Sequence, residues 1–139
     1  MDRETARALV DAGYMPLREY VEAYPMIELR LPVPVSVNAM YRNVAKVGRV
    51  KTGKYTNWPK EADKWLLTQK RGLKPFEGPC AVELRVPAKC RADVSNLIKC
   101  AEDFLVSRLI TPDDRYTRKV SAERDASLTD HCVITVRAA

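Results

Sequence analysis

The stretch AVELRVPAKCRADVSNLIKCAEDFLVS, residues 81–107, contains a strand pattern followed by a helix pattern. Apolar and polar residues alternate from Ala81 to Val86, as in a half-buried strand, and Pro87 ends it because proline cannot donate to a sheet ladder. After Asp93, apolar residues recur with the helical period to about Ser107. We therefore predict a strand, a short basic loop and an amphipathic helix, in that order.

The predicted helix after Asp93 has two different faces when its residues are placed at 3.6 per turn. The apolar face carries Val94, Leu97, Ile98, Ala101, Phe104 and Leu105. The opposite, polar face carries Ser95, Asn96, Lys99, Glu102 and Asp103. We expect the apolar face to pack on a sheet, and Asp93 to stand at the N-cap position near the free backbone N–H groups of the first turn.

Upstream of this stretch we predict a strand, a flap and a second helix. The strand runs from Met26 to Leu31 and ends at Pro32. Residues 39–57 contain two glycines and alternate basic with apolar or aromatic residues, which favours an irregular hairpin or flap. Thr56 or Asn57 can then cap a helix that places Pro59 near its first turn and reaches about Arg71.

Downstream, two further strands are predicted, from Tyr116 to Ala122 and from Cys132 to Val136. The order of elements predicts a single α/β (α+β) domain over residues 26–139, with one mixed β-sheet packed by two main helices. Residues 1–25 show a helical pattern divided at Gly13 and Pro16, and we interpret them as an N-terminal helical extension.

Composition restricts the function classes. No apolar run approaches a membrane span, and the charged N-terminus leads into no apolar segment, so we expect a cytoplasmic protein without a signal peptide. The four cysteines include no C-x-x-C pair, which favours free thiols. His131 is the only histidine, which argues against a histidine-dependent triad or a histidine-rich metal site. Any metal chemistry must therefore use carboxylates.

Charge is unevenly distributed along the chain. The net charge is +6, and no Asp or Glu occurs between Leu29 and Lys60. The basic residues in that interval are Arg30, Arg42, Lys46, Arg49, Lys51, Lys54 and Lys60. This segment favours an anionic partner, either nucleic acid or an acidic protein surface, although a solubilising flap has the same composition.

The acidic residues near the second helix have a plain structural interpretation. In this interpretation Asp93 caps the helix and has no further role, Lys99 pairs with Glu102, and Pro112-Asp113-Asp114 forms an ordinary turn. The functional alternative is that these carboxylates gather into one site.

Taken together, three segments resemble the RusA family of Holliday-junction resolvases. They are Lys89-Cys90-Arg91-Ala92-Asp93-Val94-Ser95-Asn96-Leu97-Ile98-Lys99, then Glu102-Asp103-Phe104-Leu105, then Pro112-Asp113-Asp114. The family signature is an acidic residue, a hydrophobic one, Asp or Ser, then Asn-Leu-x-Lys, and an Asp-Asp pair after a helix. The proline-rich segment from Leu31 to Asn38, its continuation to Arg42, and Tyr55-Thr56-Asn57 are similar to the family as well. The resemblance extends from about residue 26 to the C-terminus.

The resemblance implies the site residues. The catalytic residues would be Asp93, Lys99 and Asp114, while Ser95 stands where well-studied members have a third carboxylate. The metal would be Mg²⁺, for which Mn²⁺ may substitute, because both prefer oxygen ligands. We rank Asp93 and Asp114 first as ligands, with Asp113 and Asp103 second, and expect Asp93 and Asp114 to converge on one ion.

The resemblance also implies the partners: branched DNA, in particular four-way junctions, and a second copy of the chain in a homodimer. The expected DNA-binding residues are Asn38, Tyr41, Arg42, Lys46, Arg49, Lys51, Lys54, Lys89, Arg91 and Asn96. The implied activity is a Mg²⁺-dependent crossover junction endodeoxyribonuclease of recombination and repair, in a bacterial or phage-infected cytoplasm. The alternatives are a catalytically weakened protein that binds branched DNA and a general metal-dependent nuclease.

Overall fold

The computed structural model describes residues 5, 8–9, 11–13, 26–69, 76, 78–111 and 113–139, without the side chain of Asp114. Most of the predicted N-terminal helical extension lies outside the described residues, as does the predicted end of the first long helix near Arg71 and Gly72. No helix in the described ranges is long and apolar enough to cross a membrane.

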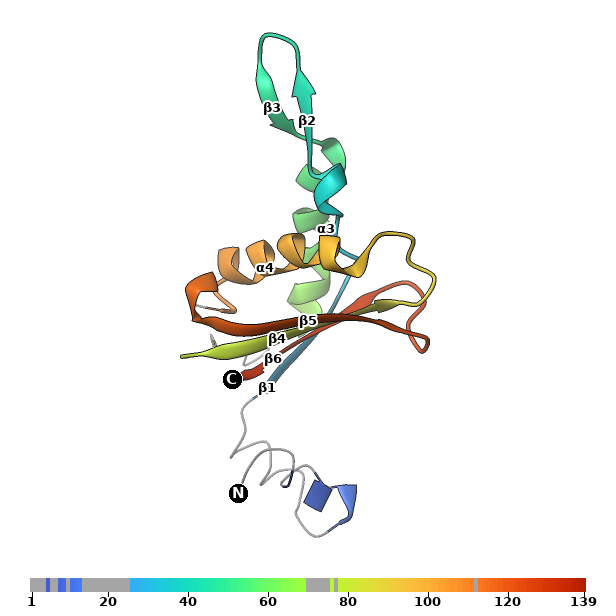
Figure 1. The fold of residues 1–139 in the computed structure, drawn as a ribbon, viewed down its shortest axis with the longest axis vertical. Helices are drawn as coiled ribbons and strands as arrows, with labels where there is room; N and C mark the ends of the chain where they lie inside the picture. The colour runs from blue at the N-terminus through green and yellow to red at the C-terminus, as the bar shows by residue number, and fades with distance from the viewer. Residues whose placement is uncertain are drawn as a thin grey trace.

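The centre of the fold is a four-stranded sheet (Figure 1). Its strands are β1 (Met26–Leu31), β4 (Cys80–Pro87), β5 (Thr117–Asp125) and β6 (Cys132–Ala138), in the spatial order β1-β6-β4-β5. Only β4 and β5 are parallel; the other neighbours are antiparallel. The predicted mixed sheet is therefore confirmed.

The connection between the parallel strands β4 and β5 is helical. It begins as a 3-10 turn, η2 (Val94–Leu97), and continues as α4 (Ile98–Ser107), which lies along one face of the sheet in Figure 1. Leu97, Ala101, Phe104 and Leu105 are buried, as the predicted apolar face requires. Two neighbouring parallel strands need a crossover connection of this kind, because a tight turn reverses the chain and can join only antiparallel strands.

The first long helix, α3 (Gly53–Gln69), begins earlier than the sequence pattern suggested. The prediction of a cap at Thr56 or Asn57 is wrong, because the cap is Thr52, four residues before Thr56. The Thr52 hydroxyl accepts a hydrogen bond from the Tyr55 backbone N–H at 3.2 Å. Pro59 consequently lies inside the helix and not in its first turn.

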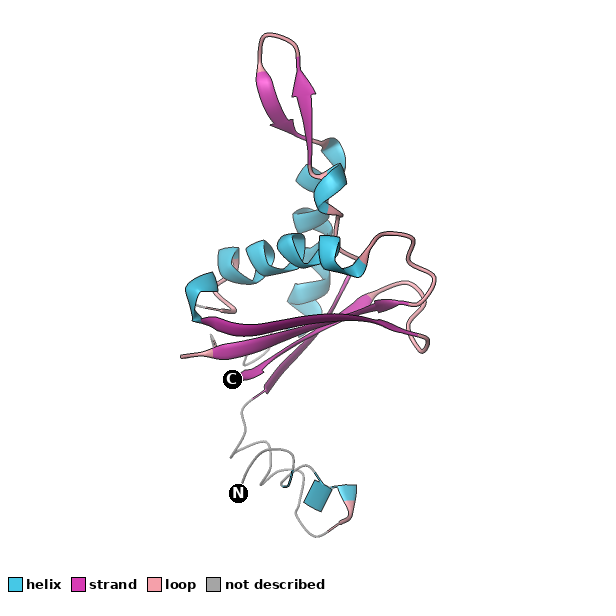
Figure 2. Ribbon diagram, in the orientation of Figure 1, coloured by secondary structure: helices cyan, strands magenta, loops and turns pink. Residues whose placement is uncertain are grey.

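A separate two-stranded hairpin precedes α3. Its strands, β2 (Tyr41–Val44) and β3 (Gly48–Lys51), pair with each other and form no part of the four-stranded sheet. Figures 1 and 2 show it projecting away from the body of the molecule. The predicted hairpin is confirmed, and its tip contains Lys46 and Gly48 in left-handed backbone conformations.

Contacts with both α4 and β1 hold α3 in place. Trp58 packs edge-on against Phe104 of α4, with ring centroids 5.2 Å apart. Gln69 donates to the Arg30 carbonyl and accepts from the Arg30 N–H, both at 2.7 Å, and so covers the free edge of β1. The body is thereby one packed unit from which the hairpin extends.

Candidate active site and nucleic-acid surface

Asp93 lies in the loop that leaves the carboxyl end of β4, immediately before η2. Its backbone is extended (φ −63°, ψ 130°), its residue surface is exposed, and its side chain makes no capping hydrogen bond. The interpretation of Asp93 as a simple helix cap is therefore not supported. Its carboxylate stays available to a ligand.

The loop that carries Asp93 is anchored by Arg124 near the end of β5. The Arg124 guanidinium donates to the Cys90 carbonyl and, at 3.0 Å, to the Ala92 carbonyl. This anchor holds the Asp93 end of the loop against the carboxyl end of the β4–β5 pair. Lys89 and Arg91, in the same loop, are exposed beside it.

Asp114 begins a short 3-10 turn, η3 (Asp114–Tyr116), that leads into the other end of β5. Nine residues of strand, Thr117–Asp125, separate η3 from the Arg124 end, a span of roughly 26 Å at 3.3 Å per residue. Figure 1 shows the two ends of β5 on opposite sides of the body. The parallel crossover therefore places the Asp93 loop and η3 at opposite ends of β5, and the topology does not bring the two segments together within one chain.

Asp113 is engaged locally. Its Oδ1 accepts a hydrogen bond from the Arg115 backbone N–H at 3.1 Å, and its Oδ2 lies 3.6 Å from the Arg115 Nε. This is the turn that the Pro-Asp-Asp sequence predicted.

Lys99, Asp103 and Tyr55 form a connected polar group. The Lys99 ammonium donates to Asp103 Oδ1 at 3.0 Å, and the Tyr55 hydroxyl donates to Asp103 Oδ2 at 3.4 Å. Burial, and secondarily the negative charge of Asp103, raises the pKa of Tyr55 to about 12. Tyr55 is thus a phenol, and a donor, throughout the physiological range. Asp103 lies on α4 with these partners and away from the Asp93 loop.

In the described part of the chain, no three His, Cys, Asp or Glu side chains are grouped closely enough to hold a metal ion. The Asp114 side chain is outside that part.

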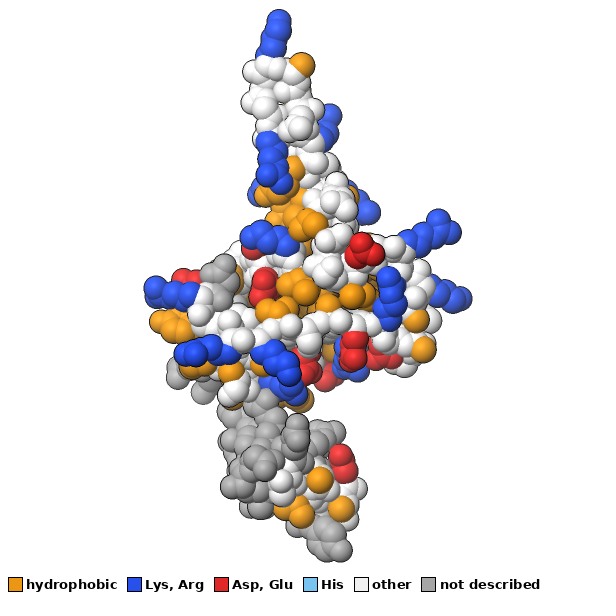
Figure 3. All heavy atoms as spheres, viewed as in Figure 1, with side chains coloured by type: hydrophobic (Ala, Val, Ile, Leu, Met, Phe, Trp, Pro, Cys, Tyr) orange, Lys and Arg blue, Asp and Glu red, His pale blue; other side chains and the backbone are white. Residues whose placement is uncertain are grey.

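The expected DNA-binding residues fall into two groups. Most lie on or near the hairpin, where the Arg49 guanidinium is 4.2 Å from the Tyr41 ring centroid and the Lys51 ammonium is 5.5 Å from that of Tyr55. Figure 3 shows Lys and Arg side chains along the hairpin. Asn38, Arg42, Lys46 and Lys54 are exposed in this group. Lys89, Arg91 and the half-buried Asn96 form the second group beside Asp93.

A cavity of about 370 Å³ lies at the foot of the hairpin, between α3 and α4. Its lining includes Tyr41, Tyr55, Asp103 and Phe104. The sequence pattern did not predict this cavity and placed Phe104 only on the apolar face that packs on the sheet. No spacing pattern could have revealed it, because its walls come from β2, β3, α3 and α4, which only the fold brings together.

A family model described as Endodeoxyribonuclease RusA matches residues 31–137. A search among curated proteins finds no match for the chain.

Proposed function

Because the chain belongs to the RusA family of endodeoxyribonucleases, we propose that it is a Mg²⁺-dependent endonuclease that resolves four-way DNA junctions in recombination and repair. The family match over most of the chain carries this proposal. The exposed Asp93, whose side chain makes no capping hydrogen bond, supports the proposal together with the basic residues Lys89 and Arg91 beside it. Their positive charge attracts the DNA polyanion, which the carboxylate alone would repel.

Asp93 and Asp114 are the proposed ligands. Asp93 fits a hard cation because its carboxylate oxygens are not used in capping η2. Asp113 and Asp103 fit less well, since Arg115 and Lys99 already engage them. When bound, Mg²⁺ or Mn²⁺ neutralises phosphoryl oxygens and lowers the pKa of an attacking water.

We place the complete site between two copies of the chain. The two ligands lie at opposite ends of β5 in one chain, so one ion can join them only if a second copy supplies Asp114. A two-fold axis that supplies Asp114 to one site supplies it to the other as well, which gives a homodimer with two equivalent sites. Two such sites match the two opposed strands that a resolvase nicks.

The free edge of β5 is the surface we propose for this dimer. Among the residues that the structure describes, β5 pairs only with β4 and occupies one edge of the four-stranded sheet. Antiparallel pairing of two β5 strands would set the Asp114 end of one copy against the Arg124 end of the other. That is the end where the Asp93 loop is anchored.

The side chains around the site have distinct proposed roles. Lys99 neutralises negative charge on the scissile phosphate, for which a compact ammonium is suited. Asn96 orients a carboxylate or a bound water. The hairpin group binds phosphates of the junction arms, and Lys89 and Arg91 bind those next to the cut.

Subunit mixing tests the proposal. Asp93→Asn and Asp114→Asn chains should each fail to cut a four-way junction in Mg²⁺ while still binding it. Co-refolded together, they should regain nicking of one strand, because the mixed dimer holds one site with both aspartates and one with neither. If mixing restores nothing while each variant binds junctions as dimers, the shared site is wrong.

Ser95 favours a second candidate, a protein that binds junctions but cuts them weakly, because serine replaces a charged ligand. Junction binding without Mg²⁺- or Mn²⁺-dependent cleavage by the unaltered chain would select this candidate. Equal cutting of linear duplex would instead indicate a general nuclease.

A further inference from the structure

We propose that the cavity at the foot of the hairpin is a pocket for one unstacked nucleobase, and that it prefers bases with an exocyclic amino group. The inference rests on the proposed action on branched DNA and adds a site that reads the base at the branch. We call this cavity the base pocket; Tyr41, Tyr55, Cys100, Asp103 and Phe104 line it, together with Lys51.

The walls of the base pocket suit a flat aromatic ligand. Tyr41 and Tyr55 meet edge-to-face, with centroids 5.7 Å apart and planes at 68°, so they present two differently oriented surfaces. Phe104 and Cys100 are buried behind them. Burial raises the pKa of the Cys100 thiol to about 11, which keeps it neutral and makes that wall apolar. Bases stack on such aromatic walls whatever their sequence.

Asp103 supplies the hydrogen-bond acceptor on the polar side of the base pocket, which Ser107 and Arg108 also line. Lys99 and Tyr55 each donate to a different oxygen of its carboxylate, which leaves further lone pairs on both oxygens. A carboxylate with two donors already on it is an acceptor only, and it can therefore bind only a donor edge. Carboxylates accept from the cytosine amino group in the same way in DNA grooves.

The four bases differ in the hydrogen-bond donors that they can offer to the Asp103 carboxylate. Cytosine and adenine offer an amino group, and guanine offers an amino and an imino N–H side by side. Thymine offers one N–H between two carbonyl oxygens, which the Asp103 carboxylate repels. The expected order of affinity is guanine first, then cytosine and adenine, then thymine.

The surroundings of the base pocket favour DNA as the source of the base. The pocket opens at the root of the basic hairpin, and Lys51, exposed at its rim, can hold the phosphate attached to the base. Figure 3 shows hydrophobic side chains where the hairpin joins the body, flanked by Lys and Arg. A base at a branch point is the easiest to extrude, because its stacking is already interrupted.

The inference is tested by binding in EDTA, which separates recognition from cleavage. Four junctions would be compared that differ only in one unpaired nucleotide at the branch: G, C, A or T. The wild-type chain should bind the G, C and A junctions several-fold more tightly than the T junction. A 2-aminopurine at the same place should lose fluorescence on binding, as it stacks on tyrosine.

Variants should move this preference in defined ways. Asp103→Asn adds an amide donor and should bring the four affinities together, whereas Tyr55→Ala should weaken all four and abolish the 2-aminopurine change. Glu61→Gln is the matched control, since Glu61 pairs with Lys64 on the exposed surface of α3 and should leave the preference intact.

Equal affinities of the wild-type chain for all four junctions would overturn the base pocket, and so would an Asp103→Asn variant that keeps the preference. Because the first measurement needs no variant, misfolding of a variant cannot obscure it. Failure to bind any junction would instead contradict the proposed function itself.

Discussion

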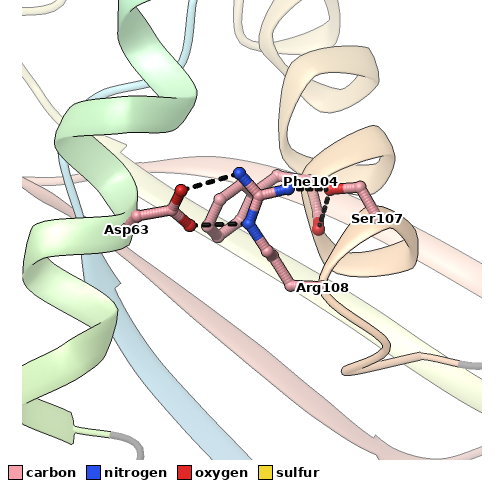
Figure 4. Close-up of polar contacts among 4 residues, drawn as sticks. All are labelled: Asp63, Phe104, Ser107 and Arg108. Carbon is pink, nitrogen blue, oxygen red and sulfur yellow. Dashed lines mark hydrogen bonds and ion pairs between the residues drawn. The ribbon is translucent and has the colours of Figure 1, made fainter.

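Arg108, at the C-cap position of α4, forms a bidentate ion pair with Asp63 in the middle of α3 (Figure 4). The Arg108 Nε lies 2.6 Å from Asp63 Oδ1, and a terminal guanidinium nitrogen lies 2.7 Å from Oδ2. The guanidinium also lies 4.9 Å from the Phe104 ring centroid. The hydrogen bond to Asp63 raises the pKa of Arg108, so the guanidinium keeps its charge. It joins the two helices that form the walls of the base pocket.

The first prediction concerns this pair. Arg108→Lys should lower the free energy of unfolding by about 1 kcal/mol, because a lysine cannot bind both carboxylate oxygens and the pair is partly exposed. Urea denaturation would measure the loss. Asp63→Asn should cost a similar amount, and the double variant should cost less than the sum of the two; strict additivity would mean that the pair contributes no coupling.

The second prediction concerns the catalytic residues. Lys99→Ala should reduce junction cleavage in Mg²⁺ by about 100-fold or more and leave junction binding nearly unchanged, because the lost charge acts mainly on the transition state. Single-turnover cleavage beside a gel-shift titration gives both quantities. Wild-type cleavage by the Lys99→Ala chain would remove Lys99 from the catalytic set.

The third prediction follows from Ser95. Ser95→Asp restores a carboxylate near Asp93 and should lower the Mg²⁺ concentration needed for half-maximal cleavage several-fold, since Mg²⁺ binds through carboxylate oxygens. A Mg²⁺ titration of the cleavage rate would measure it. Thr68→Asp, at an exposed threonine near the end of α3, is the control and should not have this effect. An unchanged Mg²⁺ requirement in Ser95→Asp would place residue 95 outside the metal site.

The fourth prediction concerns the hairpin. Lys46→Ala and Arg49→Ala should each reduce the slope of log K against log salt by about 1, if each cation contacts one phosphate. Lys64→Ala, which removes an exposed lysine of α3, should leave the slope unchanged. Hairpin variants with wild-type salt dependence would show that the hairpin serves solubility instead.

The fifth prediction concerns pH. Burial raises the pKa of Cys100 to about 11 and that of Cys132 to about 12, above the usual value of 9.0. The folded chain therefore holds these protons more tightly than the unfolded chain. The contribution of these two thiols to stability should be constant at pH values well below 9 and should fall as the pH rises from 9 toward 11. Urea denaturation with reductant at pH 8 and 10 would show it, and Cys132→Ala should flatten the decline.

Strands and the second helix were predictable because their periodicity is local. The alternation from Met26 to Leu31 and the apolar face of α4 both appear in the structure as predicted. The start of α3 was not predictable in the same way, because Gly53 and Asn57 are typical loop residues and the cap that decides the boundary, Thr52, lies before the glycine.

The geometry of the site was less accessible to sequence reasoning. The candidate residues came from a family resemblance, which the family match confirms, but the placement of Asp93 depends on Arg124, whose contact with Ala92 spans 32 residues. Which strands are parallel decides whether Asp93 and Asp114 meet in one chain, and no local pattern encodes strand order.

Pro59 gives the hairpin a mechanical consequence. Proline has no N–H, so the helical bond that would join residue 59 to the Tyr55 carbonyl cannot form, and α3 is weakest at this step. The turns of α3 before Pro59 are continuous with β3, whereas the turns after it are fastened to β1 through Gln69. Trp58, immediately before Pro59, is nevertheless held by the Phe104 ring and by the carbonyls of Pro32 and Val33. A pull on the hairpin tip by bound DNA would therefore be transmitted to the body through Trp58 and through the bond between Tyr55 and Asp103.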